Sequence, residues 1–253
     1  MNEILDLITP NIIIMITITA VLAGMVKGIV GFAMPMIFIT GMTTFMGPDV
    51  ALGILILPTL IGNGWQAGRQ GFAAAYQALL DHRWFLGIGY TTLLVTTQMV
   101  PLLSQSLFFL YLGVLVVGFA SLILSGWQPK GRSGTGLLIG CALVAGVGGG
   151  LSGVWGPPTV MYLSTHKLEK QAQMRAQGVI YGLGAILLLI GHVRSGIATL
   201  PALSLGAFAI LPACLGIWVG FKIQDRINQK IFGIATLSIL ILAGLNLIRR
   251  GTM

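Results

Sequence analysis

Two short stretches of this sequence, 122 residues apart, decide how the chain must fold. Residues 23–35 read AGMVKGIVGFAMP and residues 145–157 read AGVGGGLSGVWGP, so both follow the pattern A-G-x3-G-x2-G-x3-P. Glycine permits non-helical backbone and close approach of helices, and proline removes a hydrogen-bond donor from a helix. Each stretch therefore predicts a break in an otherwise helical segment.

The composition around these stretches is that of an integral membrane protein. Of 253 residues, 56% are hydrophobic and only 8% are charged, and the mean hydropathy is +0.94. A soluble globular protein carries about 25% charged residues, which argues against a cytosolic enzyme. The net charge of +8 comes from 14 Lys and Arg residues spread along the chain. Without a dense basic run, these residues are typical of membrane-protein loops. We expect a lipid bilayer as partner and no nucleic acid.

Charge-free windows predict the membrane segments, because about 20 apolar residues cross a hydrocarbon core. The windows are 7–26, 28–48, 50–68, 84–129, 133–166, 176–193, 195–221 and 231–248. Two windows are long enough for two segments each, so we count ten, of which those near 28–48 and 154–166 are candidates for half-helices or re-entrant segments. The predicted fold class is an all-α polytopic membrane protein with eight to ten hydrophobic segments.

The two matched stretches also predict an internal repeat. We expect a first repeat over residues 1–127, a basic connector over 128–133 and a second repeat over 134–253. With five segments in each half, the second repeat is inverted relative to the first. If all ten segments cross and the N-terminus is outside, 11 of the 14 Lys and Arg residues fall on the cytoplasmic side. That asymmetry agrees with the positive-inside rule.

Paired breaks at corresponding positions of two halves are typical of a transporter's substrate site. Non-helical backbone lies at membrane depth only where it is buried in protein or lines a watery cavity, and the N-terminus of a half-helix favours an anion. The alternative is that these glycines only pack helices together. The break residues predicted to bind substrate are Gly28, Gly31, Pro35, Gly150, Ser152, Gly153, Trp155 and Pro157.

The two stretches resemble the paired glycine-rich signatures, each ending in proline, of the TauE/SafE sulfite-exporter family. The resemblance extends over essentially the whole chain. It implies a multi-spanning carrier for sulfite or small organosulfonates in the bacterial inner membrane. The first copy departs from the family pattern by placing Lys27 and Phe32-Ala33 where small residues are usual.

Two basic residues are candidate anion ligands. Lys27 lies inside the first break, where it is either an anion ligand or a lysine whose ammonium reaches the membrane surface. Arg175 opens an apolar helix and is either a bidentate sulfonate clamp or a cytoplasmic anchor. Gln173 and Gln177 share a helix face that Arg175 does not, and Gln177 is the predicted extra donor.

Polar residues inside apolar windows complete the candidate site. Asn63 and Gln66 lie one turn apart, and they either bind substrate or form interhelical hydrogen bonds. His192 near a window end is expected at the membrane interface, with proton coupling as its alternative role. Asp49 is expected to cap a helix before Val50, with a proton relay as its alternative. The three histidines share no metal-ligand spacing, so we expect neither a metal nor a cofactor.

The function predicted from these features is a secondary transporter for small anions, most readily sulfite or organosulfonates. The predicted mechanism is alternating access around a midplane site at the two breaks. The alternatives are a passive anion channel and a membrane-embedded enzyme. An enzyme is disfavoured because the sequence contains no HExxH motif, no paired carboxylates and no nucleotide motif. Glycine-rich outer faces also permit a homodimer.

Overall fold

A computed structural model describes residues 9–126, 134–224, 226 and 228–253. These residues form helices and turns, with no strand among them. The all-α prediction is therefore confirmed. The connector predicted at 128–133 lies outside the described residues.

Eight segments of the described chain are long and apolar enough to cross a membrane. They are α2 (Pro10–Val30), α4 (Pro48–Gly68), α6 (Arg83–Thr97) with the 3-10 turn η1 (Val100–Leu102), α7 (Gln105–Leu124), α8 (Thr135–Ser152), α10 (Lys170–Arg194), α11 (Leu200–Ile223) and α12 (Gln229–Thr252). This finding confirms a multi-spanning membrane protein within the predicted range of segments.

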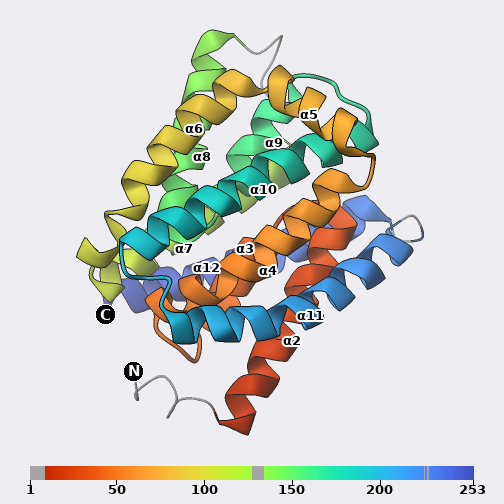
Figure 1. Cartoon of the computed structure of the whole chain (residues 1–253). Coiled ribbons are helices and arrows are strands. Elements are labelled where there is room, and N and C mark those ends of the chain that lie inside the picture. Colours follow the sequence, from red (N-terminus) through yellow and green to blue (C-terminus); the bar gives the residue numbers. More distant parts are fainter. Residues whose placement is uncertain (1–8, 127–133, 225, 227) are drawn as a thin grey trace.

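Each glycine–proline stretch ends one long helix and begins a short one (Figure 1). α2 ends at Gly31 (φ +84°) and is followed by α3 (Met34–Met42), while α8 ends at Gly153 (φ +71°) and is followed by α9 (Gly156–Ser164). A positive φ is strained for residues with a Cβ, so glycine suits both turns. Nine residues rise about 14 Å, which is about half of a hydrocarbon core.

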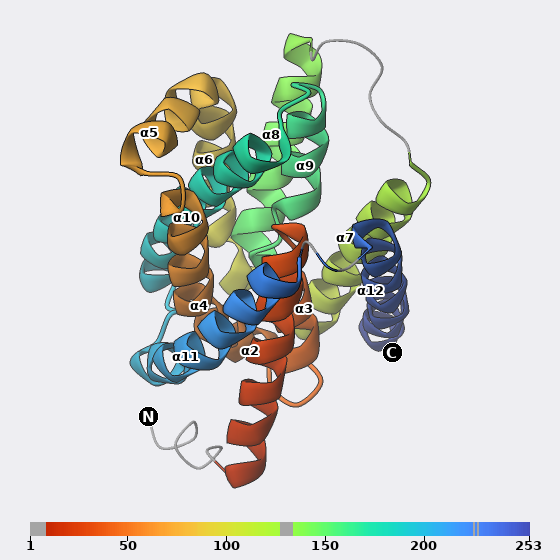
Figure 2. The ribbon, with the colours of Figure 1, turned by 90° about the vertical axis from the view of Figure 1, so that its right-hand side faces the viewer.

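The chain reverses direction at both short helices (Figures 1 and 2). α2 and α4 run the same way through the bundle, and α8 and α10 run the opposite way. α5 (Phe72–Asp81) lies across the end of the bundle where α4 ends and α10 begins, and we call this the α5 end. At the opposite end, Arg250 donates to the Thr43 carbonyl at 2.6 Å and thereby joins α12 to the end of α3.

Close helix pairs hold the bundle together. α2 packs along α11, α6 along α8 and α7 along α12, while α4 packs against both α10 and α11. A Cβ on Gly28 would lie 2.5 Å from the Ile217 carbonyl oxygen and 2.9 Å from the Gly220 Cα. Such backbone approach allows extensive van der Waals contact, which drives helix association in lipid.

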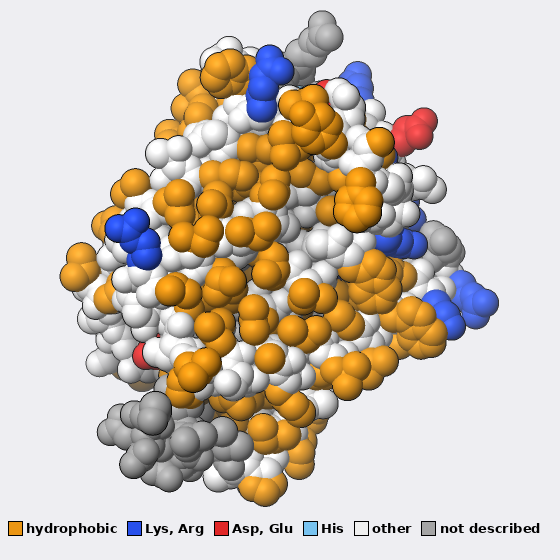
Figure 3. Space-filling view, viewed as in Figure 1, with side chains coloured by type: hydrophobic (Ala, Val, Ile, Leu, Met, Phe, Trp, Pro, Cys, Tyr) orange, Lys and Arg blue, Asp and Glu red, His pale blue; other side chains and the backbone are white. Residues whose placement is uncertain are grey.

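The outer surface is apolar, as a lipid-facing surface requires. In Figure 3 hydrophobic side chains cover most of the visible face, and charged side chains lie toward its margins. Large side chains such as Leu211 and Leu242 are more than two-thirds exposed, at 68% and 69%. Figure 2 also shows α7 and α12 set to one side of the other helices, which they contact through α2, α3 and α9.

The start of α4 differs from the sequence prediction. Gly47 is the N-cap and Pro48 the first helical residue, so Asp49 lies in the first turn and is not the cap. Proline is favoured at the first helical position because its missing N–H has no helical partner there. The predicted capping role of Asp49 is therefore wrong.

Candidate functional site

Lys27 is a buried cation in the last turn of α2. Only 2% of the residue is exposed, and its Nζ donates to Asn63 Oδ1 and, at 2.7 Å, to Gln66 Oε1. Both acceptors lie on α4. Placing a charge at membrane depth costs at least about 2.5 kcal/mol, yet no carboxylate of the described residues pairs with Lys27. In the sequence Lys27 was singled out separately from the pair Asn63 and Gln66, and the fold brings all three together in what we call the Lys27 network.

The two glycine–proline stretches meet beside the network at a small cavity. Its lining is Lys27, Asn63, Phe32, Ala33, Pro35, Met36, Val154, Trp155, Gly156 and Tyr181. The space open to the centre of a water molecule is ≈ 10 Å³, which is room for about one water. The Tyr181 hydroxyl donates to the Gly156 carbonyl at 3.1 Å. Its ring centre lies 5.9 Å from the Lys27 ammonium, so α10 supplies one wall of the cavity.

The N-termini of both half-helices adjoin this cavity. Pro35 and Met36 from the first turn of α3 and Gly156 from the start of α9 line it. Among the described residues, neither helix has a side-chain cap. Prolines remove some first-turn donors, and the N–H groups of Met34 and Met36 in α3 and of Gly156 in α9 keep their partial positive charge. Together with Lys27, they give the cavity a positive potential that favours an anion.

A wide polar pocket, which we call the outer pocket, lies between the Lys27 network and the α5 end. It has a volume of ≈ 660 Å³, and Arg69, Lys170 and Arg175 contribute to its lining. Gln66 lies at its floor, where Nε2 donates to the Met174 carbonyl at 2.7 Å. Among the described residues, no hydrogen bond joins Arg175 to the Lys27 network, and the Arg175 guanidinium donates to Gln70 in the turn after α4. Glu169 also lines the outer pocket, so three cationic side chains and one carboxylate leave it with a net positive charge.

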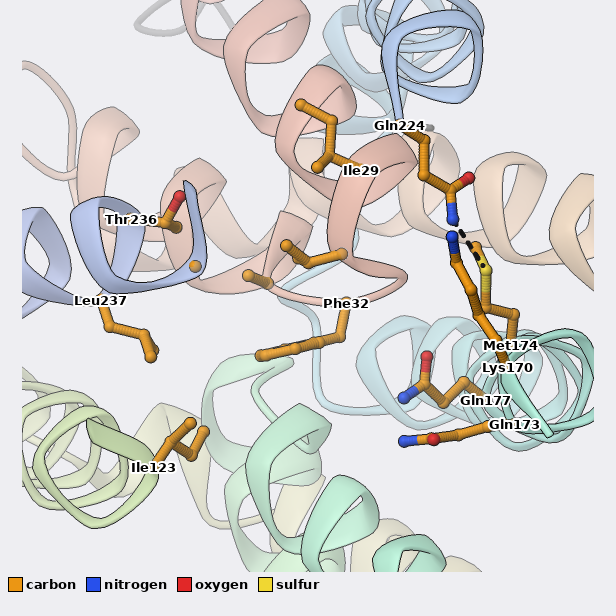
Figure 4. A pocket seen from close by; sticks show the side chains of 13 residues that line it. Ile29, Phe32, Ile123, Lys170, Gln173, Met174, Gln177, Gln224, Thr236 and Leu237 are labelled. Atoms are coloured by element: carbon orange, nitrogen blue, oxygen red, sulfur yellow. Dashed lines mark hydrogen bonds between the residues drawn. The ribbon is translucent and has the colours of Figure 1, made fainter. Parts of the chain in front are cut away.

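A second pocket, which we call the amide pocket, has a volume of ≈ 300 Å³ (Figure 4). Its lining is Ile29, Val30, Phe32, Ala33, Ile123, Lys170, Gln173, Met174, Gln177, Gln224, Gly233, Thr236 and Leu237. Gln177 is only 2% exposed, and its Oε1 has no hydrogen-bond partner among the described residues. A Cβ on Gly31 would lie 2.6 Å from that oxygen, so the Gln177 side chain rests against the first break.

The other predicted break residues have packing or turning positions. Gly28 packs on α11 and Gly150 on α6, and Gly153 turns the chain between α8 and α9. The Ser152 hydroxyl donates to a carbonyl one turn earlier at 2.9 Å. Pro157 lines a separate space between α7 and α9. These five residues lie near the breaks but outside the lining of the cavity.

The two predicted coupling residues lie near the end of the bundle opposite the α5 end. Asp49 is separated from Gln66 by about 25 Å along α4, and His192 from Gln177 by about 22 Å along α10. His192 is fully buried, with its Nδ1 3.3 Å from Ser195 Oγ. The burial of His192 arises because α6 packs against this part of α10, and its predicted position at the membrane interface stays a prediction.

Sequence reasoning did not single out Tyr181, Gln70 or Gln224. Tyr181 follows Gln177 by four residues, and this spacing places both on one face of α10. That signal was available in the sequence. Gln70 and Gln224 carry no comparable local signal, because their neighbours on α10 are more than 45 residues away in the chain.

Comparison with known proteins places the chain in a family. Residues 16–247 match the family described as "Sulfite exporter TauE/SafE". This region contains both glycine–proline stretches and the whole Lys27 network. No curated protein and no solved structure matched the chain. Because the matched region extends over nearly all of the 253 residues, the chain belongs to the TauE/SafE sulfite exporter family.

Proposed function

We propose that the protein is a secondary carrier of sulfite or small organosulfonates in the bacterial inner membrane, with Lys27 as the anion ligand. The observation that carries this proposal is a buried ammonium whose only hydrogen-bond partners among the described residues are two neutral amides. A buried charge is expensive unless it is compensated. A bound anion compensates the Lys27 charge, whereas Asn63 and Gln66 only solvate it.

The backbone around Lys27 supports the same conclusion. The uncapped N-termini of α3 and α9 adjoin the Lys27 cavity, and N–H groups at helix N-termini bind sulfate-like oxygens without side-chain charge. An anion placed there accepts hydrogen bonds from both halves of the chain. The site therefore couples substrate binding to the relative position of the two halves.

Helix packing supports an inverted repeat and alternating access. α2 packs on α11 just as α8 packs on α6, and α3 contacts α12 just as α9 contacts α7. In an inverted repeat, α2, α3, α6 and α7 of the first half correspond to α8, α9, α11 and α12 of the second. Exchanging each helix for its counterpart then turns the first contact of each pair into the second. α4 and α10, which occupy equivalent positions, pack on each other. A carrier of this kind alternates access by moving one half against the other around a fixed site.

Counterflow in proteoliposomes tests this proposal. Liposomes loaded with unlabelled sulfite should transiently accumulate external radiolabelled sulfite if the protein is a carrier, whereas a channel only equilibrates the label. Lys27→Met removes the charge and keeps the chain length, and we expect a loss of at least about tenfold in transport, because a charge-assisted hydrogen bond contributes about 1.5–3 kcal/mol.

Lys222→Met is the matched control. Lys222 is exposed at the end of α11, where its ammonium lies 3.8 Å from the centre of the Trp218 ring, and its loss should leave transport unchanged. Both variants are first shown to be monodisperse in detergent. Wild-type counterflow by folded Lys27→Met protein would overturn the assignment of Lys27.

A further inference from the structure

The amide pocket has two chemically different walls. Figure 4 shows the Gln173 and Gln177 side chains projecting from α10 into the open space, with their amide nitrogens foremost. The facing walls are mainly apolar and come from Ile123 on α7, Leu237 on α12 and Phe32 at the first break, and Thr236 on α12 adds one hydroxyl group to the lining. A pocket of this kind matches a ligand that is polar at one end and apolar at the other.

The two amides are available to a ligand. Among the described residues, no side-chain hydrogen bond is formed by Gln173 or Gln177, although Gln177 is 98% buried. The one buried atom of these two amides left without a partner in the described part of the chain is Gln177 Oε1, an acceptor that lies against the first break and does not bind an anion. The nitrogen side of both amides faces the open space (Figure 4). Each amide offers N–H donors to the oxygens of an anion.

The amide pocket also leads to the proposed transport site. Phe32 and Ala33 line both this pocket and the Lys27 cavity. An anion held by Gln177 is therefore separated from Lys27 by the first break alone. The amide pocket has a volume of ≈ 300 Å³, which is at the lower limit of about 300–1,000 Å³ for ligand pockets. The pocket therefore admits only a small molecule.

We propose that the amide pocket is a specificity site for organic anions that carry a short aliphatic chain. Gln173 and Gln177 bind the anionic head, and the wall formed by Phe32, Ile123 and Leu237 takes the hydrocarbon. The inference rests on the proposed anion transport and adds to it a preference for alkanesulfonates over inorganic sulfite. Recognition of the head alone does not distinguish these two ligands.

A homologous ligand series tests this inference. Competition of sulfite, methanesulfonate, ethanesulfonate and propanesulfonate against radiolabelled sulfite is measured in the counterflow assay. Each methylene buried on the apolar wall should tighten the apparent Kd by about fourfold, until the pocket is filled. Sulfite itself should be the weakest competitor of the series.

Two variants and a control assign the preference to this pocket. Ile123→Trp fills the apolar side and should abolish the gain in affinity with chain length. Gln177→Leu should weaken every alkanesulfonate by at least about tenfold. Val114→Trp lies on the same helix at a site that is 55% exposed and should keep the wild-type series.

The outcomes separate this inference from the proposed function. Equal affinity along the series, or an unchanged chain-length preference in Ile123→Trp, would overturn the specificity site while sulfite counterflow still supports the carrier. Absence of sulfite counterflow in the wild-type protein would overturn the proposed function, and the specificity site with it.

Discussion

Replacing Gln66 by leucine should destabilise the folded protein by about 2–4.5 kcal/mol. Gln66 is 3% exposed, its Oε1 accepts from Lys27 at 2.7 Å, and its Nε2 donates to the Met174 carbonyl at 2.7 Å. Loss of a hydrogen bond to a charged group costs about 1.5–3 kcal/mol, and loss of a neutral one about 0.5–1.5 kcal/mol. The sum of these two ranges gives the expected effect.

Denaturant unfolding in detergent measures this effect, and a double-mutant cycle with Lys27→Met isolates the shared bond. Either single substitution removes the Lys27–Gln66 hydrogen bond, so the coupling energy should be about 1.5–3 kcal/mol. Gln70→Leu is the control, because Gln70 is exposed and its bond to Arg175 should contribute less than about 1 kcal/mol. Additivity of Gln66→Leu and Lys27→Met within about 0.5 kcal/mol would refute the view that Gln66 holds the Lys27 charge.

Two further substitutions test the end of α5 and the contact between α2 and α11. The pKa of His82 is lowered from 6.5 to about 4, chiefly by burial and also by neighbouring His166, while Asp81 acts in the opposite direction. The unfolded chain therefore binds more protons between these values, and stability should fall by at most about 3 kcal/mol as pH drops from 6.5 to 4. Denaturant unfolding of His82→Gln should show a flatter pH profile, and an unchanged slope would contradict this assignment. Gly28→Ala places a methyl group 2.5 Å from α11 backbone and should cost about 1–3 kcal/mol, whereas Gly64→Ala, with no atom within 4 Å of its Cβ, should be neutral or stabilising. Equal melting temperatures for the two alanine variants would argue against tight packing of α2 on α11.

Much of the fold was predictable because membrane segments carry their signals locally. The breaks at Gly31 and Gly153 follow from glycine and proline chemistry within a dozen residues, and the structure shows a positive φ at both. Helix ends were less predictable. The start of α4 was misplaced because Asp49 is a good capping residue, while Pro48 beside it is a stronger signal for the first helical position.

The candidate site was predictable where a polar residue interrupts an apolar stretch of sequence. Lys27, Asn63 and Gln66 stand out because polar groups in apolar windows are costly, and the fold joins them although they are 36 and 39 residues apart. Tyr181 did not stand out, since an aromatic residue in a membrane helix is ordinary. The burial of His192 depends on how closely α6 approaches α10, and no local pattern encodes this.

The placement of α3 and α9 has an electrical consequence. Each half-helix rises about 14 Å from the shared cavity, in opposite directions, so we expect an anion bound as proposed to lie at about half the membrane depth. The membrane voltage contributes about 2.3 kcal/mol per elementary charge per 100 mV, and about half of that acts on the anion before it leaves the cavity. In a cell with a negative interior, this force drives a monovalent anion outward. Export through such a carrier could therefore be powered by voltage alone.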